Sequence, residues 1–293
     1  MIMERLNFLN IWYILSLFLL IVIPLTLYFI LKGKSDRTIK YTLLGIAIAN
    51  FLLHFLKFFH PTYISDINNA LIKISLENIC SVTTVILPFA MICKNKTIKG
   101  YFYLIAFLGG IMAVILTTEP NGRYIFDFES MRYYFCHYVL FTVPILAVTL
   151  KEFTPDFKSC LWMPLMFFMG QFIILLNELF LGLVGLVDYT PELFLSGDFR
   201  NPSFVFGPNT EFKSMVDSIG FLIPEIFKTN IFGIAGIGDF YWPIIWLLIP
   251  VVIFFPGVYF LFTLPFTYTD VLEFINKKKK IINKYLVNDS NNI

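Results

Sequence analysis

Seven apolar runs dominate this chain, and each is about as long as the ~20 residues that a helix needs to cross a bilayer. Hydrophobic residues make up 58% of the 293 residues and charged residues only 14%, with a mean hydropathy of +0.76. This composition is typical of a polytopic membrane protein. The seven runs are Ile11–Leu31, Tyr41–Phe59, Ile72–Ile92, Tyr101–Leu116, Tyr133–Leu150, Leu161–Val187 and Trp242–Phe266.

We therefore predict an all-α fold, a single transmembrane helical bundle over residues 1–293 with about seven spans. The first run is longer than the apolar part of a typical signal peptide and is not followed by a small-residue cleavage site. We expect it to remain as an anchor. The net charge of +2 is too small to suggest a nucleic-acid partner.

Basic residues gather in alternate connections, and this pattern predicts the orientation. By the positive-inside rule, the amino terminus lies outside and the carboxyl terminus inside. The long segment 188–241 is then an external loop, which could cover the bundle as a lid, and 270–293 is a basic cytoplasmic tail. The basic connections carry Lys32, Lys34, Arg37 and Lys40, then Lys94, Lys96 and Lys99, then Lys151 and Lys158, and finally Lys277, Lys278, Lys279, Lys280 and Lys284.

Ionisable side chains inside the apolar runs are the strongest functional signal. Such groups are costly in a membrane, so they normally face a bundle interior and mark a site. With about 1.5 Å of rise per helical residue, His54, Cys80, His137 and Glu178 come from four spans at similar depth. We expect them to surround one outward-facing polar cavity. Further polar candidates for substrate binding there are Asn78, Thr84, Asn177 and Gln171.

The third run carries a polar stripe. Glu77, Cys80, Ser81, Thr84 and Pro88 follow the i, i+3, i+4 spacing of one helix face. Taken alone, Cys80 is typical of a small packing residue. A buried carboxylate such as Glu77 needs a partner, which makes a purely structural role less common.

Cys80 and His137 together predict a specific chemistry. A thiol in apolar surroundings is inert unless a neighbouring imidazole takes its proton. The pair could attack an ester and form a thioester, which a second hydroxyl then resolves. Glu178 or Glu77 could orient the imidazole. An amide of Asn177 or Asn78 could donate to the oxyanion.

The remaining cysteines carry no such signal. Cys93, Cys136 and Cys160 are spaced neither for zinc nor for a disulfide framework. We interpret these three as structural residues. We expect no metal ion and no cofactor.

Several short segments carry a resemblance to a known family. They are Leu76-Glu-Asn-Ile-Cys80, Lys94-Asn-Lys96, Gly109-Gly110, Glu119-Pro120, Tyr133-Tyr-Phe-Cys-His137, Asn177, Asn201-Pro-Ser-Phe-Val-Phe-Gly-Pro208 and Trp242-Pro243. These segments resemble the YwaF-like bacterial integral membrane proteins, whose animal relatives include a cysteine-centred acyltransferase acting on ether lysophospholipids. The resemblance covers most of the chain. By this resemblance, Cys80 corresponds to the nucleophile and His137 to its partner.

One position departs from that family. A histidine commonly lies two residues before the cysteine there, and this chain has Asn78 instead. The base is then left to His137 or His54. The resemblance implies a multi-pass protein of the bacterial plasma membrane that moves a fatty acyl chain between phospholipids or lysophospholipids, or to another lipid-like acceptor. Membrane lipids would be its partners.

Two other functions use the same residues. Glu77, His54, His137 and Glu178 could form the proton or cation relay of a transporter. A lipid-binding membrane protein would use the cavity without turnover. Replacement of Cys80 separates these functions from acyl transfer, because only acyl transfer needs the thiol.

Overall fold

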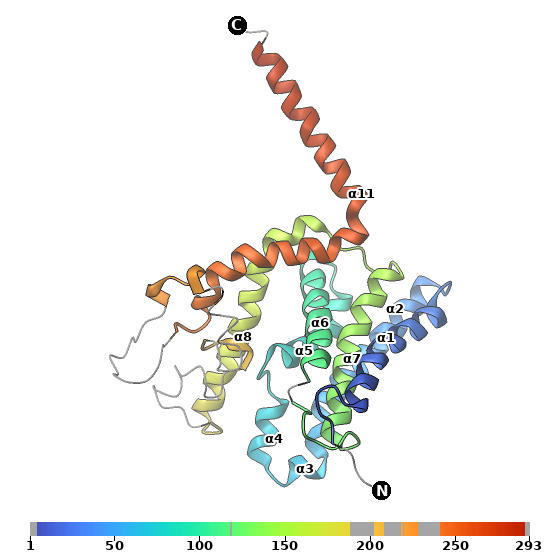
Figure 1. Cartoon of the computed structure of the whole chain (residues 1–293), viewed down its shortest axis with the longest axis vertical. Coiled ribbons are helices and arrows are strands. Elements are labelled where there is room, and N and C mark those ends of the chain that lie inside the picture. The colour runs from blue at the N-terminus through green and yellow to red at the C-terminus, as the bar shows by residue number, and fades with distance from the viewer. Residues whose placement is uncertain are drawn as a thin grey trace.

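The computed structural model is an all-α bundle (Figure 1). It describes residues 5–117, 119–187, 202–207, 218, 220–227 and 241–290, with side chains as far as residue 282. Within these ranges the backbone forms no β-strand, and a single isolated bridge joins Arg5 to Tyr124. The expected lid over 188–241 lies outside the described residues for most of its length.

The long helices follow the apolar runs closely. The first helix has the same bounds as the first run, and the other long helices overlap the remaining runs. The α-helices are α1 (Ile11–Leu31), α2 (Asp36–Leu56), α3 (Pro61–Ile64), α4 (Ile67–Ile74), α5 (Ile79–Ile92), α6 (Lys96–Leu116), α7 (Phe128–Thr149), α8 (Met163–Leu183) and α11 (Leu248–Ser290). Short 3-10 turns are η1 (Lys57–Phe59), η2 (Phe157–Trp162), η3 (Pro202–Phe204), η5 (Gly220–Leu222), η6 (Glu225–Phe227) and η7 (Ile245–Leu247).

Short polar side chains define where most of these helices begin. Each accepts a hydrogen bond from a backbone N–H in the first turn, which would otherwise lack a partner. Local sequence thus sets the helix starts, and the length of each apolar run sets how far the helix continues. The capping residues are Asn10, Ser35, Asp66, Asn78, Asn95 and Asp127.

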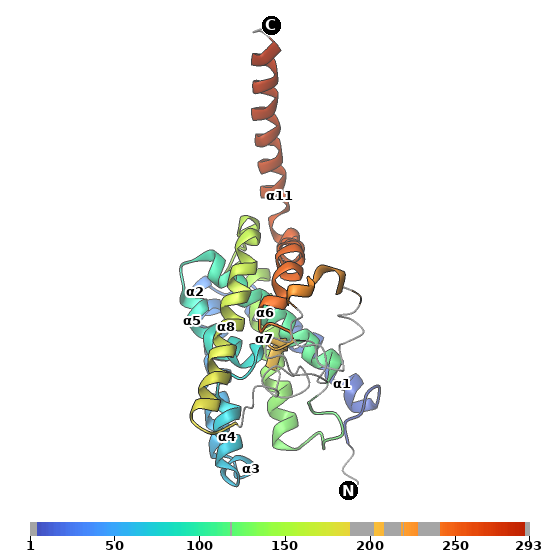
Figure 2. The same ribbon diagram turned by 90° about the vertical axis from the view of Figure 1, so that its left-hand side faces the viewer.

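Helices α6 and α7 form the centre of the bundle, and α5 packs against α6 and α2 (Figures 1 and 2). Their backbones approach closely at Gly110. A Cβ atom there would lie 2.6 Å from the Phe141 nitrogen and 2.7 Å from the His137 carbonyl oxygen. Small residues allow such approach between membrane helices. This contact fixes the part of α7 that carries His137.

Six helical segments are long and apolar enough to cross a membrane, or seven if α4 and α5 count as one bent span, among the residues that the structure describes. The expectation of about seven spans agrees with this. The expectation of one continuous helix over Ile72–Ile92 is wrong, because the chain breaks between Ile74 and Ile79 and bends by 56°. The physical reason is that Asn78 caps a new helix instead of continuing the old one.

The carboxyl-terminal helix α11 packs on the bundle with its apolar first half. Tyr259 is fully buried against Gly100 at the start of α6, and the Phe262 ring lies 5.3 Å from that of Phe107. Figures 1 and 2 both show the second half of α11 projecting away from the other helices. This projecting part contains the basic run Lys277–Lys280.

Candidate functional site

A polar cavity of about 350 Å³ lies between α2, the α4–α5 break, α6 and α7. It brings Cys80 and His137 to one cavity, together with His54, Glu77, Asn78 and Thr84. It therefore unites six of the nine predicted site residues. The other lining residues are Lys57, Lys73, Ile79, Ser81, Gly109, Met112, Ala113, Leu116, Glu119, Arg132, Tyr133, Cys136 and Ser203.

Side chains from distant parts of the sequence satisfy the backbone at the α4–α5 break. The Leu76 N–H donates to Asn177 Oδ1 at 3.2 Å, and the Ile79 N–H donates to Ser203 Oγ at 2.8 Å. Asn177 also donates to Ser75 Oγ at 3.0 Å. Non-helical backbone at membrane depth is tolerated where such partners replace the missing helical bonds.

Two basic side chains hold the last carbonyls of α4. The His54 Nε2–H donates to the Ile74 carbonyl oxygen at 2.9 Å, and the Lys57 ammonium donates to the Lys73 carbonyl oxygen at 2.6 Å. A carbonyl can only accept, so the neutral His54 ring carries its proton on Nε2. His54 thus contributes to the break and to the cavity wall.

Cys80 lies in the first turn of α5. Asn78 caps this helix by accepting from the Ser81 N–H at 2.8 Å and from Ser81 Oγ at 3.1 Å. Among the described residues, the Ile79 and Ser81 N–H groups are bonded to side chains, whereas the Cys80 N–H makes no hydrogen bond. A helix start favours negative charge through its aligned dipoles and free N–H groups. The start of α5 would therefore stabilise a thiolate at Cys80 and an oxyanion beside it.

Gly109 on α6 faces the Cys80 sulfur. A Cβ atom added there would lie 3.5 Å from Sγ, which is an ordinary contact distance. The glycine therefore leaves open the approach to the thiol from the α6 side.

His137 is buried in the middle of α7. Its Nδ1–H donates to the carbonyl oxygen of Tyr133, one turn earlier, at 2.8 Å. The centroids of the His137 imidazole and the Tyr133 ring lie 4.2 Å apart. The neutral ring therefore keeps its lone pair on Nε2. Within the described structure no hydrogen bond joins His137 to Cys80, although both line the cavity. Catalytic hydrogen bonds often tighten only when substrate is bound.

A second thiol faces the same cavity. Cys136 Sγ lies 3.6 Å from Asn50 Nδ2, which donates to it, and 3.4 Å from Thr84 Oγ1. Its hydrogen bonds to α2 and α5 agree with the structural role expected from the sequence. Its place on the cavity wall was not predicted, because nothing in the spacing relates it to Cys80.

A charged cluster lies beside the cavity, and its members Arg132, Glu119, Lys73 and Glu77 line the wall. Arg132 Nη2 lies 2.8 Å from Glu129 Oε2 and 3.8 Å from Glu119 Oε1. The Tyr63 hydroxyl also donates to Glu129 Oε2 at 2.8 Å. Burial raises the pKa of this phenol well above its usual range, so it remains a donor. Lys73 Nζ lies 3.2 Å from Glu77 Oε1.

Three predicted site residues on α8 do not line the cavity. Asn177 binds the α4–α5 break instead, and Gln171 Nε2 donates to the Ser203 carbonyl oxygen at 3.3 Å. Glu178 is fully buried elsewhere in the bundle. The roles assigned to them from the sequence remain predictions. Asn177 and Gln171 support segments that themselves reach the cavity, namely 75–79 and Ser203.

The sequence analysis missed the basic part of the cavity. Lys57, Lys73 and Arg132 lie at the ends of apolar runs, where charged residues usually face water or lipid headgroups. Their places on the cavity wall depend on how α3 and α4 fold back toward α7, which no local pattern reveals. Among the described residues, no group of three His, Cys, Asp or Glu side chains could hold a metal ion.

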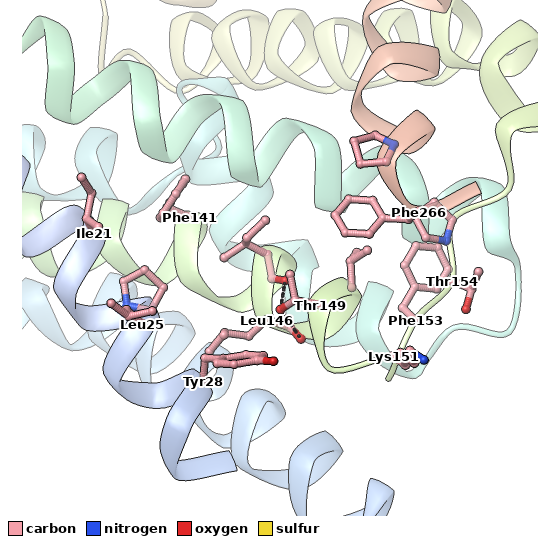
Figure 3. Close-up of a pocket in the computed structure, with 15 residues that line it drawn as sticks. Ile21, Leu25, Tyr28, Phe141, Leu146, Thr149, Lys151, Phe153, Thr154 and Phe266 are labelled. Carbon is pink, nitrogen blue, oxygen red and sulfur yellow. Dashed lines mark hydrogen bonds between the residues drawn. The ribbon is translucent and has the colours of Figure 1, made fainter. Parts of the chain in front are cut away.

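A larger cavity of about 690 Å³ lies elsewhere, between α1, α7 and α11 (Figure 3). Its wall is mainly apolar, with Leu25 and Tyr28 on one side and Phe266 on the other. Lys151 supplies a charged side chain, and none of the described residues that line it is a cysteine or a histidine. Size alone therefore does not identify the candidate site, because the predicted cysteine and histidine line the smaller polar cavity.

The fold and the cavity define a multi-pass helical membrane protein with a cysteine and a histidine facing one internal space. The chain belongs to the TMEM164 family, whose sequence profile matches residues 6–217, more than two thirds of its length. Each described residue that lines the polar cavity lies within this segment, whereas α11 lies beyond it. Neither the curated proteins nor the solved structures contain a significant match.

Proposed function

We propose that this protein is a membrane acyltransferase. In this proposal, it moves a fatty acyl chain between phospholipids or lysophospholipids, or to another lipid-like acceptor, through Cys80 and His137. The observation that carries the proposal is that Cys80, in the first turn of α5, and His137, whose Nδ1–H is bonded to the Tyr133 carbonyl oxygen, line one cavity. The bacterial plasma membrane would be its location.

In the first half-reaction, Cys80 Sγ attacks the ester carbonyl of the donor lipid while its proton passes to His137 Nε2. The carbonyl oxygen gains negative charge, and in this proposal the Cys80 N–H and the Asn78 amide nitrogen donate to it. The C–O bond then breaks, and the leaving hydroxyl takes the proton from Nε2. A thioester on Cys80 remains.

In the second half-reaction, an acceptor hydroxyl gives its proton to His137 Nε2 and attacks the thioester. The C–S bond breaks, and the sulfur regains the proton. The Tyr133 carbonyl keeps the imidazole in the required tautomer by accepting from Nδ1 in both steps. This is the role that the sequence analysis gave to a carboxylate.

The test is direct detection of the acyl-enzyme. Purified protein is incubated with a phospholipid carrying a labelled acyl chain and no acceptor, and its intact mass is measured before and after hydroxylamine. We expect one hydroxylamine-sensitive adduct in the wild type and none in Cys80→Ala. Cys136→Ala is the matched control, because it removes a thiol from the same cavity and should keep the adduct. An adduct that persists in Cys80→Ala would refute the mechanism.

The α4–α5 break favours one alternative. Discontinuous helices bind ions and substrates in many transporters, and His54, Glu77 and Arg132 lie beside this break. A proton- or cation-coupled transporter would keep its flux in Cys80→Ala reconstituted in vesicles. A lipid-binding protein would keep its affinity in the same variant and show no turnover in the wild type.

A further inference from the structure

Lys57 differs from the other buried cations of the bundle. Lys57 is the first residue after α2. It is 3% exposed and lines the polar cavity. Lys99 is paired with Glu152 at 3.4 Å and Arg132 with Glu129 at 2.8 Å. Among the described residues, no carboxylate lies within 4.0 Å of the Lys57 ammonium. A buried charge without a counter-charge is costly, so an anion is expected to complete this place.

The geometry of Lys57 leaves room for such an anion. An ammonium has three N–H donors, and one of them goes to the Lys73 carbonyl oxygen. On another side, the Tyr63 ring centroid lies 6.0 Å from Nζ. The remaining donors are available to a ligand in the cavity.

The charges of the cavity wall point the same way. Lys73 is paired with Glu77 and Arg132 with Glu129, so among the described residues that line the cavity Lys57 is the one lysine or arginine without a carboxylate within 4.0 Å. A phosphodiester carries one negative charge. In a glycerophospholipid the phosphate lies a few bonds from an ester carbonyl. The phosphate and the ester carbonyl can therefore enter the same cavity of about 350 Å³, which Cys80 also lines.

We propose that the Lys57 ammonium anchors the phosphate of a glycerophospholipid in this cavity and thereby directs an ester of that lipid to Cys80. Lys73 and Arg132 add positive potential at the same place. The second half of this statement rests on the proposed acyl transfer. The first half, a phosphate subsite at Lys57, does not.

The experiment measures binding without turnover. All variants are made in the Cys80→Ala background and titrated in detergent, by native mass spectrometry, with lysophosphatidylethanolamine and with a monoacylglycerol of the same chain. Lys57→Gln keeps a donor for the Lys73 carbonyl but removes the charge. Lys57→Arg keeps the charge. Lys151→Gln is the matched control, because it removes an exposed charge at the other cavity.

We expect Lys57→Gln to bind the lysophospholipid about tenfold more weakly, as for loss of one charge-assisted hydrogen bond. Its affinity for the monoacylglycerol should not change. Lys57→Arg and Lys151→Gln should both bind like the Cys80→Ala parent. Unchanged affinity of Lys57→Gln for the lysophospholipid would overturn the proposal. Equal loss for both lipids would overturn it too, because Lys57 would then serve only the Lys73 carbonyl.

A separate titration with inorganic phosphate identifies the source of the anion. The proposal expects weak binding of free phosphate and little displacement of the lysophospholipid. Free phosphate that binds as tightly as the lipid and displaces it would overturn the lipid assignment. If the wild type forms no thioester while Lys57-dependent lipid binding persists, the proposed acyl transfer fails and the phosphate subsite stands.

Discussion

Asn177 Oδ1 on α8 accepts a hydrogen bond from the Leu76 N–H at 3.2 Å, inside the break that separates α4 from α5. A residue that the sequence placed in a substrate site is thus bonded to the backbone four residues before Cys80. The position of the thiol depends on this contact, since α5 begins directly after the break. The first prediction concerns its contribution to stability.

Asn177→Leu should lower the free energy of unfolding by about 1–3 kcal/mol, because the part-buried Leu76 N–H loses its acceptor and Ser75 Oγ loses a donor. Thermal unfolding in detergent measures the effect. Phe172→Leu is the control on the same helix, since its half-exposed ring faces away from the core. An unchanged unfolding temperature in Asn177→Leu would contradict the role of Asn177 as a support of the break.

Two neighbouring glycines should respond differently to alanine. Gly110→Ala places a methyl group 2.6 Å from the Phe141 backbone nitrogen, so the helices must separate, at a cost of about 1–3 kcal/mol. Gly109→Ala meets only the Cys80 sulfur at 3.5 Å and should fold normally. It should nevertheless slow formation of the Cys80 adduct by narrowing the approach. The test measures the unfolding temperature and the rate of adduct formation of both variants. An equal loss of stability in the two variants would contradict the prediction.

The identity of the base is testable with two glutamines. His137→Gln should slow acylation of Cys80 by about 10²–10⁴-fold, the usual value of a placed general base. His54→Gln keeps a donor for the Ile74 carbonyl and should retain most of the rate. The rate of adduct formation, followed by mass, provides the comparison. The opposite order of effects would assign the base to His54.

The carboxylates provide a fourth test. Since the Tyr133 carbonyl already accepts from His137 Nδ1, Glu178→Gln should leave the acylation rate close to wild type. Glu77→Gln weakens the ion pair with Lys73 at the cavity wall and should affect lipid affinity more than rate. Separate measurement of KM and kcat distinguishes the two. A large loss of kcat in Glu178→Gln would show that this carboxylate acts on the imidazole after all.

The orientation predicted from the basic residues can be checked with reporters. Fusions after Leu31 and after Ile282 should report a cytoplasmic position, and one in the turn before Pro61 an external one. Protease protection in intact cells gives an independent measurement. An external reporter after Ile282 would remove the seven-span count and the orientation that depends on it.

The length of the apolar runs predicted most of the fold. The bounds of α1 agree residue for residue with the first apolar run. The third run was read as one helix because its apolar residues continue across Ser75–Asn78. The capping pattern at Asn78 was a visible signal for the break, since an Asn before an apolar run is typical of a helix start.

A cavity residue could be predicted where its depth along a span determines its position. It could not be predicted where the packing of the helices determines its position. Cys80 and His137 share a cavity because two spans carry them at similar depth. Lys57 and Cys136 could not be found in that way. Their places depend on how α4 folds back and on how α7 rotates against α2 and α5.

The side chains that bond to the backbone at the α4–α5 break are synthesised much later than the break itself. Leu76 and Ile79 obtain their partners from Asn177 and Ser203, more than a hundred residues further along the chain. When the first five apolar segments have left the ribosome, the backbone around the thiol still lacks these acceptors. The backbone around the cysteine can therefore complete its hydrogen bonds only after the chain has been made as far as Ser203, so its final geometry depends on segments that follow it by more than a hundred residues.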